Sequence, residues 1–225
     1  MKNKLVPVLI IAIAATFSSC KKKDNTSPAT ANLMFVNACA AGATTVNLDG
    51  KVSGTTIVGA SNIGFLKNSG YKSVAAGTSD ISFFVTGLNQ LTHASESMVA
   101  GSYYSVFAGG SITQPVLVFS ADDRTAPATG MAKVRFVNLC PDNLTTSCYI
   151  GTVKVDSNVA YQTVTPFIQV AAGTIKVGMF DQTTLTNSAI INSQVLAAGT
   201  IYTFIFTGTS TGSGSSVLTL TPITN

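Results

Sequence analysis

Few residues in this chain have side chains suited to catalysis. The single histidine, His93, lies in the segment Leu91-Thr92-His93-Ala94-Ser95-Glu96. Histidine, serine and a carboxylate are the residue types of a hydrolase triad, but sequence neighbours on a strand or loop need not converge in space. A later segment that parallels this one, residues 188–195, has no histidine. We therefore expect His93 to be a solvated surface residue, and we predict no catalytic residues.

The sequence also gives no metal or cofactor site. A zinc site needs several cysteines or histidines at set spacings, and Cys39, Cys140 and Cys148 form no Cys-x-x-Cys pair. A calcium loop needs closely spaced acids, and the only such cluster is Asp122-Asp123. We expect this pair to be solvated charge beside a linker. No glycine-rich phosphate loop precedes a helix, so no cofactor is predicted.

Aromatic side chains could instead bind a sugar by stacking on its ring. The chain has no tryptophan, and most of its twelve phenylalanines and six tyrosines fall inside apolar runs. Core packing explains four of them, which are Phe83, Phe84, Phe204 and Phe206. Tyr71, Tyr149 and Tyr161 are nearer to turns and are the better platform candidates.

The N-terminus has the pattern of a bacterial export signal. Lys2 and Lys4 precede an uncharged apolar run from Leu5 to Phe17. This run is shorter than the roughly 20 residues of a membrane-spanning helix but fits a signal peptide. Phe17-Ser18-Ser19-Cys20 then resembles the lipobox of bacterial lipoproteins, with Phe17 in place of the usual Leu. We predict a signal peptide over residues 1–19 and lipidation of Cys20.

The alternative is an ordinary signal peptide, cut near Ala14-Ala15, with a chance cysteine. With lipidation, residues 20–31 become a tether between the lipid and the folded part. Lys21 to Lys23 are either solvated or in contact with anionic head groups. Lys21, as the residue after the cysteine, favours transfer to the outer membrane by resemblance to general lipoprotein sorting. The periplasmic and the surface-exposed orientation both remain open.

The net charge of +4 comes from the N-terminal segment. Five of the thirteen basic residues and one of the nine acids lie in the first 24 positions, which leaves eight of each sign from residue 31 onward. The folded part therefore lacks the basic footprint of a nucleic-acid-binding protein.

The chain repeats itself once. Leu33-Met34-Phe35-Val36-Asn37-Ala38-Cys39 returns as Val134-Arg135-Phe136-Val137-Asn138-Leu139-Cys140. Four further matches follow in the same order, which are 62–65 with 158–161, 74–78 with 170–174, 100–104 with 198–202, and 116–117 with 217–218. Two domains are therefore predicted, over residues 32–124 and 132–225, with a linker over 125–131.

Each copy has the pattern of short β-strands. The clearest predicted strands are 33–36, 82–85 and 103–108 in the first copy and 134–137, 176–180 and 201–207 in the second. Turns are predicted between them at Asp49-Gly50 and at the Gly-Thr or Gly-Ser pairs that begin at residues 77, 101, 173 and 199. Only 10% of the residues are charged, and no helical period is visible. We expect an all-β protein of two tandem, immunoglobulin-like antiparallel β-sandwiches.

The ordered series of motifs in the second copy resembles a known domain family. The series is Val134–Asn138, Cys140-Pro141-Asp142, Asn158–Tyr161, Val164–Phe167, Val170–Thr174 and Ala197–Tyr202. It is similar to domain of unknown function 4397 (DUF4397), found in bacterial envelope proteins and notably in lipoproteins of the Bacteroidota type. The first copy fits more loosely, because Ala40-Ala41-Gly42 replaces the family's acidic loop. The resemblance implies a sandwich fold and an envelope location, and no established chemistry.

The remaining cysteines suggest one disulfide. The envelope is oxidising enough for such bonds. If the strands on either side of Pro141–Ser147 form a hairpin, Cys140 and Cys148 face each other and pair. Cys39 has no such partner in its own copy, so we expect it to be free and buried. The alternative is a Cys39–Cys140 bridge between the copies.

These observations favour a non-enzymatic envelope lipoprotein that acts in adhesion, assembly or the binding of an unidentified protein or glycan ligand. The alternative is a glycan-binding lipoprotein of a nutrient-uptake system. An enzyme of unrecognised type ranks third. The expected partners are the membrane, through the lipid, and that ligand.

Overall fold

The computed structural model describes residues 28–40, 42, 44–142, 145–182 and 188–225. The predicted signal peptide, Cys20 and most of the predicted tether lie outside these residues. Strand β1 (Thr30–Asn37) begins inside the predicted tether, and Ala31 is fully buried. In the described part of the chain, no helix has the length and hydrophobicity that a membrane span requires.

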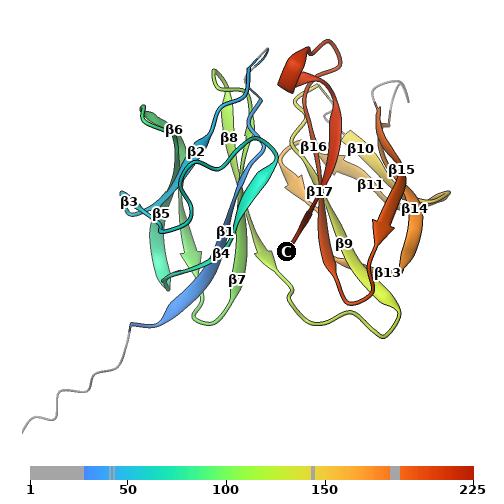
Figure 1. The fold of residues 1–225 in the computed structure, drawn as a ribbon, viewed down its shortest axis with the longest axis horizontal. Coiled ribbons are helices and arrows are strands. Elements are labelled where there is room, and N and C mark those ends of the chain that lie inside the picture. The colour runs from blue at the N-terminus through green and yellow to red at the C-terminus, as the bar shows by residue number, and fades with distance from the viewer. Residues whose placement is uncertain (1–27, 41, 43, 143–144, 183–187) are drawn as a thin grey trace, which may run out of the picture.

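The chain is all-β, as predicted, and its strands fall into two successive sets (Figure 1). The first set continues after β1 with β2 (Leu48–Val52), β3 (Thr55–Thr56), β4 (Lys67–Ala75), β5 (Gly77–Val85), β6 (Gln90–Met98), β7 (Tyr103–Gly110) and β8 (Pro115–Asp122). We call this set repeat 1.

The second set, repeat 2, follows a linker without regular structure. It contains β9 (Met131–Asn138), β10 (Thr145–Ile150), β11 (Val153–Ala160), β12 (Thr163–Val164), β13 (Ile168–Ala171), β14 (Gly173–Asp181), β15 (Ser188–Leu196), β16 (Ile201–Thr207), the 3₁₀ turn η1 (Gly214–Ser216) and β17 (Thr219–Thr224). All six strands predicted from the sequence lie within β1, β5, β7, β9, β14 and β16.

Each repeat is a sandwich of two sheets, and the four sheets stack side by side (Figure 1). The outer sheets have the orders β3-β2-β5-β6 and β11-β10-β14-β15. The inner sheets have the orders β4-β1-β7-β8 and β12-β9-β16-β17, and β13 also pairs with β9. In both inner sheets the first strand pairs in parallel with the long aromatic strand, β1 with β7 and β9 with β16.

The protein has three apolar cores rather than two. One lies inside each sandwich, around Phe35 in repeat 1 and Phe136 in repeat 2. A third lies between the inner sheets and includes Met34, Phe107 and Ile205. The inner sheets are therefore covered on both faces, which explains why their central strands are nearly continuously apolar instead of alternating.

The predicted turn at Asp49-Gly50 is wrong. Both residues lie inside β2, where Gly50 pairs with Phe83 on β5. A side chain at position 50 would collide with the ring of Phe35, so glycine is required here by packing. The chain instead turns at Ser53-Gly54, where both residues have positive φ angles.

The repeated Asn-x-Cys motif connects the two sheets of each sandwich. The Asn37 amide donates hydrogen bonds of 2.8 Å to the carbonyls of Val46 and Ile63. Its counterpart Asn138 donates one of 3.1 Å to the Val159 carbonyl. Both asparagines are fully buried, and their side-chain oxygens accept the amide N–H of the cysteine two residues later. The motif is therefore structural in both repeats.

A tyrosine also occupies equivalent positions in the two repeats. The Tyr104 hydroxyl accepts the amide N–H of Val99 at 2.9 Å, and the Tyr202 hydroxyl accepts that of Ala197 at 3.0 Å. The acceptor lies five residues after the donor in both cases. This bond resembles the tyrosine corner of immunoglobulin-like sandwiches, and it fixes the bend before β7 and β16.

Candidate functional site

A buried ion pair joins the two inner sheets. Arg135 on β9 and Asp122 at the end of β8 have side chains that are 1% and 0% exposed, and Nη2 of the arginine lies 2.6 Å from Oδ1 of the aspartate. Within the described part of the chain, Oδ1 accepts no well-aligned hydrogen bond, so this contact is electrostatic. The prediction that Asp122 is a solvated linker charge is wrong, because the carboxylate turns into the interface between the repeats.

Polar side chains from both repeats surround the ion pair. The hydroxyls of Tyr71 and Ser105 each donate to Oδ2 of Asp122 at 2.5 Å. The Arg135 Nε donates to the Thr203 hydroxyl at 2.9 Å. Burial lowers the pKa of Arg135, and Asp122 opposes that shift. Burial, followed by the Asp122 charge, raises the pKa of Tyr71 well above its usual value. Tyr71 is therefore part of the interface and not an exposed sugar platform.

The ion pair breaks a local two-fold relation between the repeats. The strand pairings place Met34 of repeat 1 where repeat 2 has Arg135, and Asn225 of repeat 2 where repeat 1 has Asp122. The Asn225 amide donates to the Tyr71 hydroxyl at 3.3 Å, across the interface. The ion pair thus has the uncharged residues Met34 and Asn225 at the equivalent positions of the other repeat.

The linker is also bound to repeat 2. The Lys133 ammonium, nearly buried, lies 2.9 Å from a carboxylate oxygen of Asp123 and donates to the backbone carbonyl and the hydroxyl of Thr125. Hydrogen bonds from Lys133 and Thr125 lower the pKa of Asp123 well below its usual value. Asp123, unlike Asp122, is half exposed, in agreement with its predicted place beside the linker.

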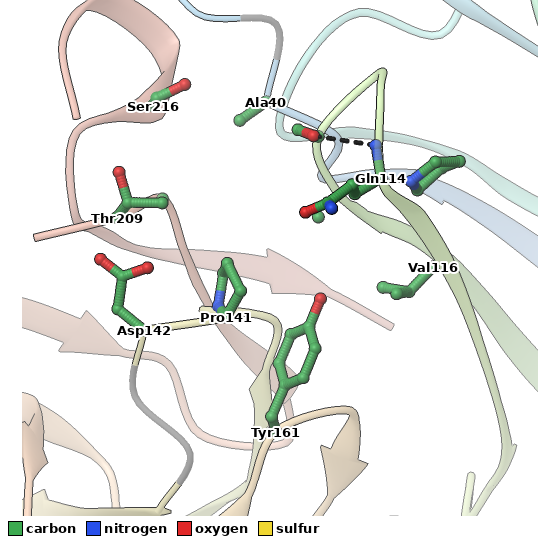
Figure 2. A pocket seen from close by; sticks show the side chains of 12 residues that line it. Ala40, Gln114, Val116, Pro141, Asp142, Tyr161, Thr209 and Ser216 are labelled. Carbon is green, nitrogen blue, oxygen red and sulfur yellow. Dashed lines mark hydrogen bonds between the residues drawn. The ribbon is translucent and has the colours of Figure 1, made fainter. Parts of the chain in front are cut away.

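At one end of the interface the loops of the two repeats leave a cleft of about 530 Å³. Gln114 and Val116, from the β7–β8 hairpin of repeat 1, face Pro141, Asp142 and Tyr161 of repeat 2 (Figure 2). Ala40, Gly110, Ser111, Pro115, Gly208, Thr209 and Ser216 complete the lining. We call this space the loop-end cleft.

The polar groups of the loop-end cleft are held by hydrogen bonds. The Asp142 carboxylate accepts the Ser210 amide N–H at 2.6 Å and the Ser210 hydroxyl at 2.8 Å. Across the interface, the Ser216 hydroxyl accepts the Gly42 amide N–H at 3.2 Å. The β7–β8 turn is fixed by the backbone N–H of Gln114, which donates to the Ser111 hydroxyl at 3.0 Å (Figure 2). These groups are therefore positioned before any ligand arrives.

Tyr161 contributes both a ring and a hydroxyl to the cleft. Burial, with smaller contributions from the Cys140 and Cys39 thiols, raises the pKa of its phenol. The hydroxyl therefore stays protonated at neutral pH, where it can donate or accept a hydrogen bond. Tyr161 is the one predicted platform residue that the structure places in this cleft.

A serine motif that can be recognised in the sequence lies beside the cleft. Gly208-Thr209-Ser210-Thr211-Gly212 has the Gly-x-Ser-x-Gly pattern of a nucleophile elbow. That elbow requires a strand, a sharp turn and then a helix. Here the segment connects β16 to η1 and β17, and the Ser210 hydroxyl donates to Asp142. The only histidine of the chain lies in the outer sheet of repeat 1, so no base of that type reaches Ser210.

His93 lies on the edge strand β6, exposed as predicted. Its Nδ1 is 2.8 Å from Oδ1 of Asp80, and both side chains are about half exposed. Ser95 and Glu96 are consecutive on this strand, so they point to opposite faces. The three residues of the apparent triad therefore do not converge. Among the described residues, no three His, Cys, Asp or Glu side chains gather as metal ligands would.

The hairpin expected between Cys140 and Cys148 is wrong. Cys140 follows β9 of the inner sheet, whereas Cys148 lies in β10 of the outer sheet, so the two strands face each other across the sandwich. Both cysteines pack in the core of repeat 2, and Cys148 is a free thiol in this structure. Cys39 is also free and fully buried, and burial raises the pKa of its thiol to about 12.

Two aromatic residues singled out in the sequence, Phe84 and Tyr149, lie on the outer faces of the repeats. Phe83, Phe204 and Phe206 are fully buried, as predicted, but Phe84 lies on the outer face of repeat 1, with the Lys51 ammonium 3.6 Å from its ring centroid. Tyr149 lies on the outer sheet of repeat 2, away from the loop-end cleft.

Comparison with known proteins supports the expected family, although the match falls mainly on repeat 1 and not, as expected, on repeat 2. A search of curated proteins found no match to this chain. One family model matches residues 31–147, just over half of the chain, and it is described as a domain of unknown function (DUF4397). The match covers repeat 1 except for Thr30, β9 of repeat 2 and the first half of β10, so it includes the ion pair and residues from both sides of the shared core. The chain belongs to the DUF4397 family.

Proposed function

We propose that this protein is a non-catalytic cell-envelope lipoprotein that binds a ligand in the loop-end cleft. The observation that carries the proposal is the cleft itself, which is formed by loops of both repeats above an interface fixed by an apolar core and a buried ion pair. A preformed concave site with a few oriented polar groups is the usual form of a ligand site.

The chemistry of the lining supports binding rather than catalysis. Among the described residues that line the cleft, only Asp142 and Tyr161 have titratable side chains. The Asp142 carboxylate already accepts two hydrogen bonds from Ser210, and burial raises the pKa of the Tyr161 phenol, so neither group is placed to act as a base near neutral pH. The hydroxyls of Ser111, Thr209 and Ser216 instead offer donors and acceptors to a polar ligand.

Binding arrays of oligosaccharides and of short peptides test this proposal. The wild-type protein should give a specific signal that Tyr161→Ala and Asp142→Asn each weaken, because one removes the ring and the other the charge. Tyr149→Ala, a matched change on the outer sheet, should preserve that signal. An array signal that is unaffected by both cleft substitutions would contradict the proposal.

The second candidate is a glycan-binding lipoprotein of a nutrient-uptake system. One observation favours it: an aromatic ring, an amide and several hydroxyls share the cleft, which suits a polyhydroxylated ligand. Genes for a porin-type transporter and glycosidases beside this one would support this candidate, and the oligosaccharide array tests it directly.

The membrane anchor is part of the same proposal. Cleavage before Cys20 would leave the lipid as the attachment of the mature chain. Cys20→Ala should abolish labelling with a fatty-acid probe and release the protein from membranes. Labelling that persists in this variant would exclude Cys20 as the modified residue.

A further inference from the structure

The outer sheet of repeat 2 has a second hollow, of about 260 Å³, lined by Tyr149, Gly151, Lys176, Gly178 and Phe180. It lies on the face of β10 and β14 that points away from the sandwich core. This hollow is separate from the loop-end cleft and shares no lining residue with it.

The two rings of the hollow form a corner. The centroids of Tyr149 and Phe180 are 5.2 Å apart, and the planes meet at 84°. A side chain at Gly178 would collide with the Phe180 ring, which therefore lies directly over the backbone of β14. The absence of that side chain lets one ring cover the strand while the other lies beside it, and both residues remain partly exposed.

Repeat 1 provides an internal comparison. The strand pairings place Ser82 at the position of Gly178, Lys51 at that of Tyr149 and Phe84 at that of Phe180. There the Lys51 ammonium covers the face of Phe84 as a cation–π contact. The ring in repeat 1 is thus occupied by the protein's own cation, whereas the corner in repeat 2 is open.

The charges around the open corner favour an anionic ligand. Lys176, two residues before Gly178 on β14, is exposed and lines the hollow. Lys154 on β11 is also exposed and pairs with Tyr149 in the sheet, outside the lining. The geometry points to a binding site for a carboxylated sugar residue of an acidic polysaccharide, with the apolar face of the sugar ring on Phe180 and its carboxylate on Lys176.

Affinity electrophoresis in polygalacturonate tests this site, with the methyl-esterified polymer as a control that keeps the rings and removes the charge. At 0.15 M salt, the full chain should be retarded by polygalacturonate and far less by its ester. Phe180→Ala and Lys176→Gln should each weaken retardation roughly tenfold, which corresponds to about 1.4 kcal/mol. Lys176 is exposed, so its substitution preserves the fold even where Phe180→Ala does not.

Matched variants separate the site from general charge attraction. Lys67→Gln makes the same charge change on an exposed lysine of β4 in repeat 1, and Phe84→Ala removes the equivalent ring of repeat 1, so both should bind like wild type. No retardation, equal binding of the ester, or equal losses in Lys67→Gln and Lys176→Gln would overturn the proposal. Loss of binding in Asp142→Asn would assign the polymer to the loop-end cleft instead.

Discussion

Replacing Arg135 with methionine removes one member of the buried ion pair and copies the residue at the equivalent position, Met34. Asp122 would then be a fully buried carboxylate supported by the hydroxyls of Tyr71 and Ser105 alone. Loss of one partner from a buried pair costs about 3–5 kcal/mol, because an uncompensated charge is left behind. For a chain of this size, the midpoint of thermal unfolding should fall by roughly 6–20 °C.

The double variant Arg135→Met with Asp122→Asn should recover most of that loss. It would replace both charged residues with the residue types that the other repeat has at the equivalent positions, Met34 and Asn225. A buried ion pair is often no more stabilising than apolar or neutral groups of similar volume, since desolvation offsets the attraction. We expect the double variant to be within about 1–2 kcal/mol of wild type.

Urea unfolding measures the coupling energy between Arg135 and Asp122 directly. It compares the wild type with Arg135→Met, with Asp122→Asn and with the double variant. A coupling energy of about 2 kcal/mol or more is expected, because each single change leaves the other charge buried and unpaired. If the single substitutions were mild and their effects additive, the carboxylate would not depend on the arginine, and the assignment of this pair as the polar centre of the interface would be refuted.

Three further predictions concern stability. Cys39 and Tyr71 have raised pKa values in the folded state, to about 12 for Cys39, so these groups lose their protons at lower pH in the unfolded chain than in the folded chain. The free energy of unfolding should therefore be constant below pH 9 and should fall above it, by up to about 1.4 kcal/mol per pH unit for each group. Urea titrations at pH 7 to 10.5 measure this fall. Tyr202→Phe should cost about 1 kcal/mol in thermal unfolding, because it leaves the Ala197 amide without its acceptor. Residues 132–225 alone should give a β-type circular dichroism spectrum, as expected from the complete set of strands, but should dimerise in sedimentation experiments, because Ile205 and its neighbours are uncovered.

The strands were predictable because their signals are local. Runs such as Tyr103–Ala108 combine β-branched and aromatic residues, and Gly101-Ser102 and Gly199-Thr200 lie in the turns before β7 and β16, although Gly77 and Gly173 are the first residues of β5 and β14. The repeat added a second, independent reading of each strand. The failure at Asp49-Gly50 shows the limit of local signals, because a glycine that makes room for Phe35 has the same sequence appearance as a turn glycine.

The candidate sites were only partly predictable, because they depend on which sheets face each other. Two of the three proposed platform tyrosines, Tyr149 and Tyr161, line hollows, whereas Tyr71 is bonded to Asp122. Nothing near Asp122 in the sequence indicates burial, since its partner Arg135 follows a linker and belongs to the other repeat. The hairpin expected between Cys140 and Cys148 failed for a related reason, because β9, which precedes Cys140, and β10, which contains Cys148, lie in different sheets.

The sequence does contain a signal for the interface, which appears when strands of the outer sheets are compared with strands of the inner sheets. The outer strand β6 alternates between exposed and covered positions, as expected for a sheet with one solvated face. In contrast, β9 and β16 of the inner sheet of repeat 2 have no exposed residue. Such runs need cover on both faces, and Arg135 within β9 needs a buried carboxylate. The four-layer stack meets both requirements, and it also brings the loops of the two repeats together around the cleft.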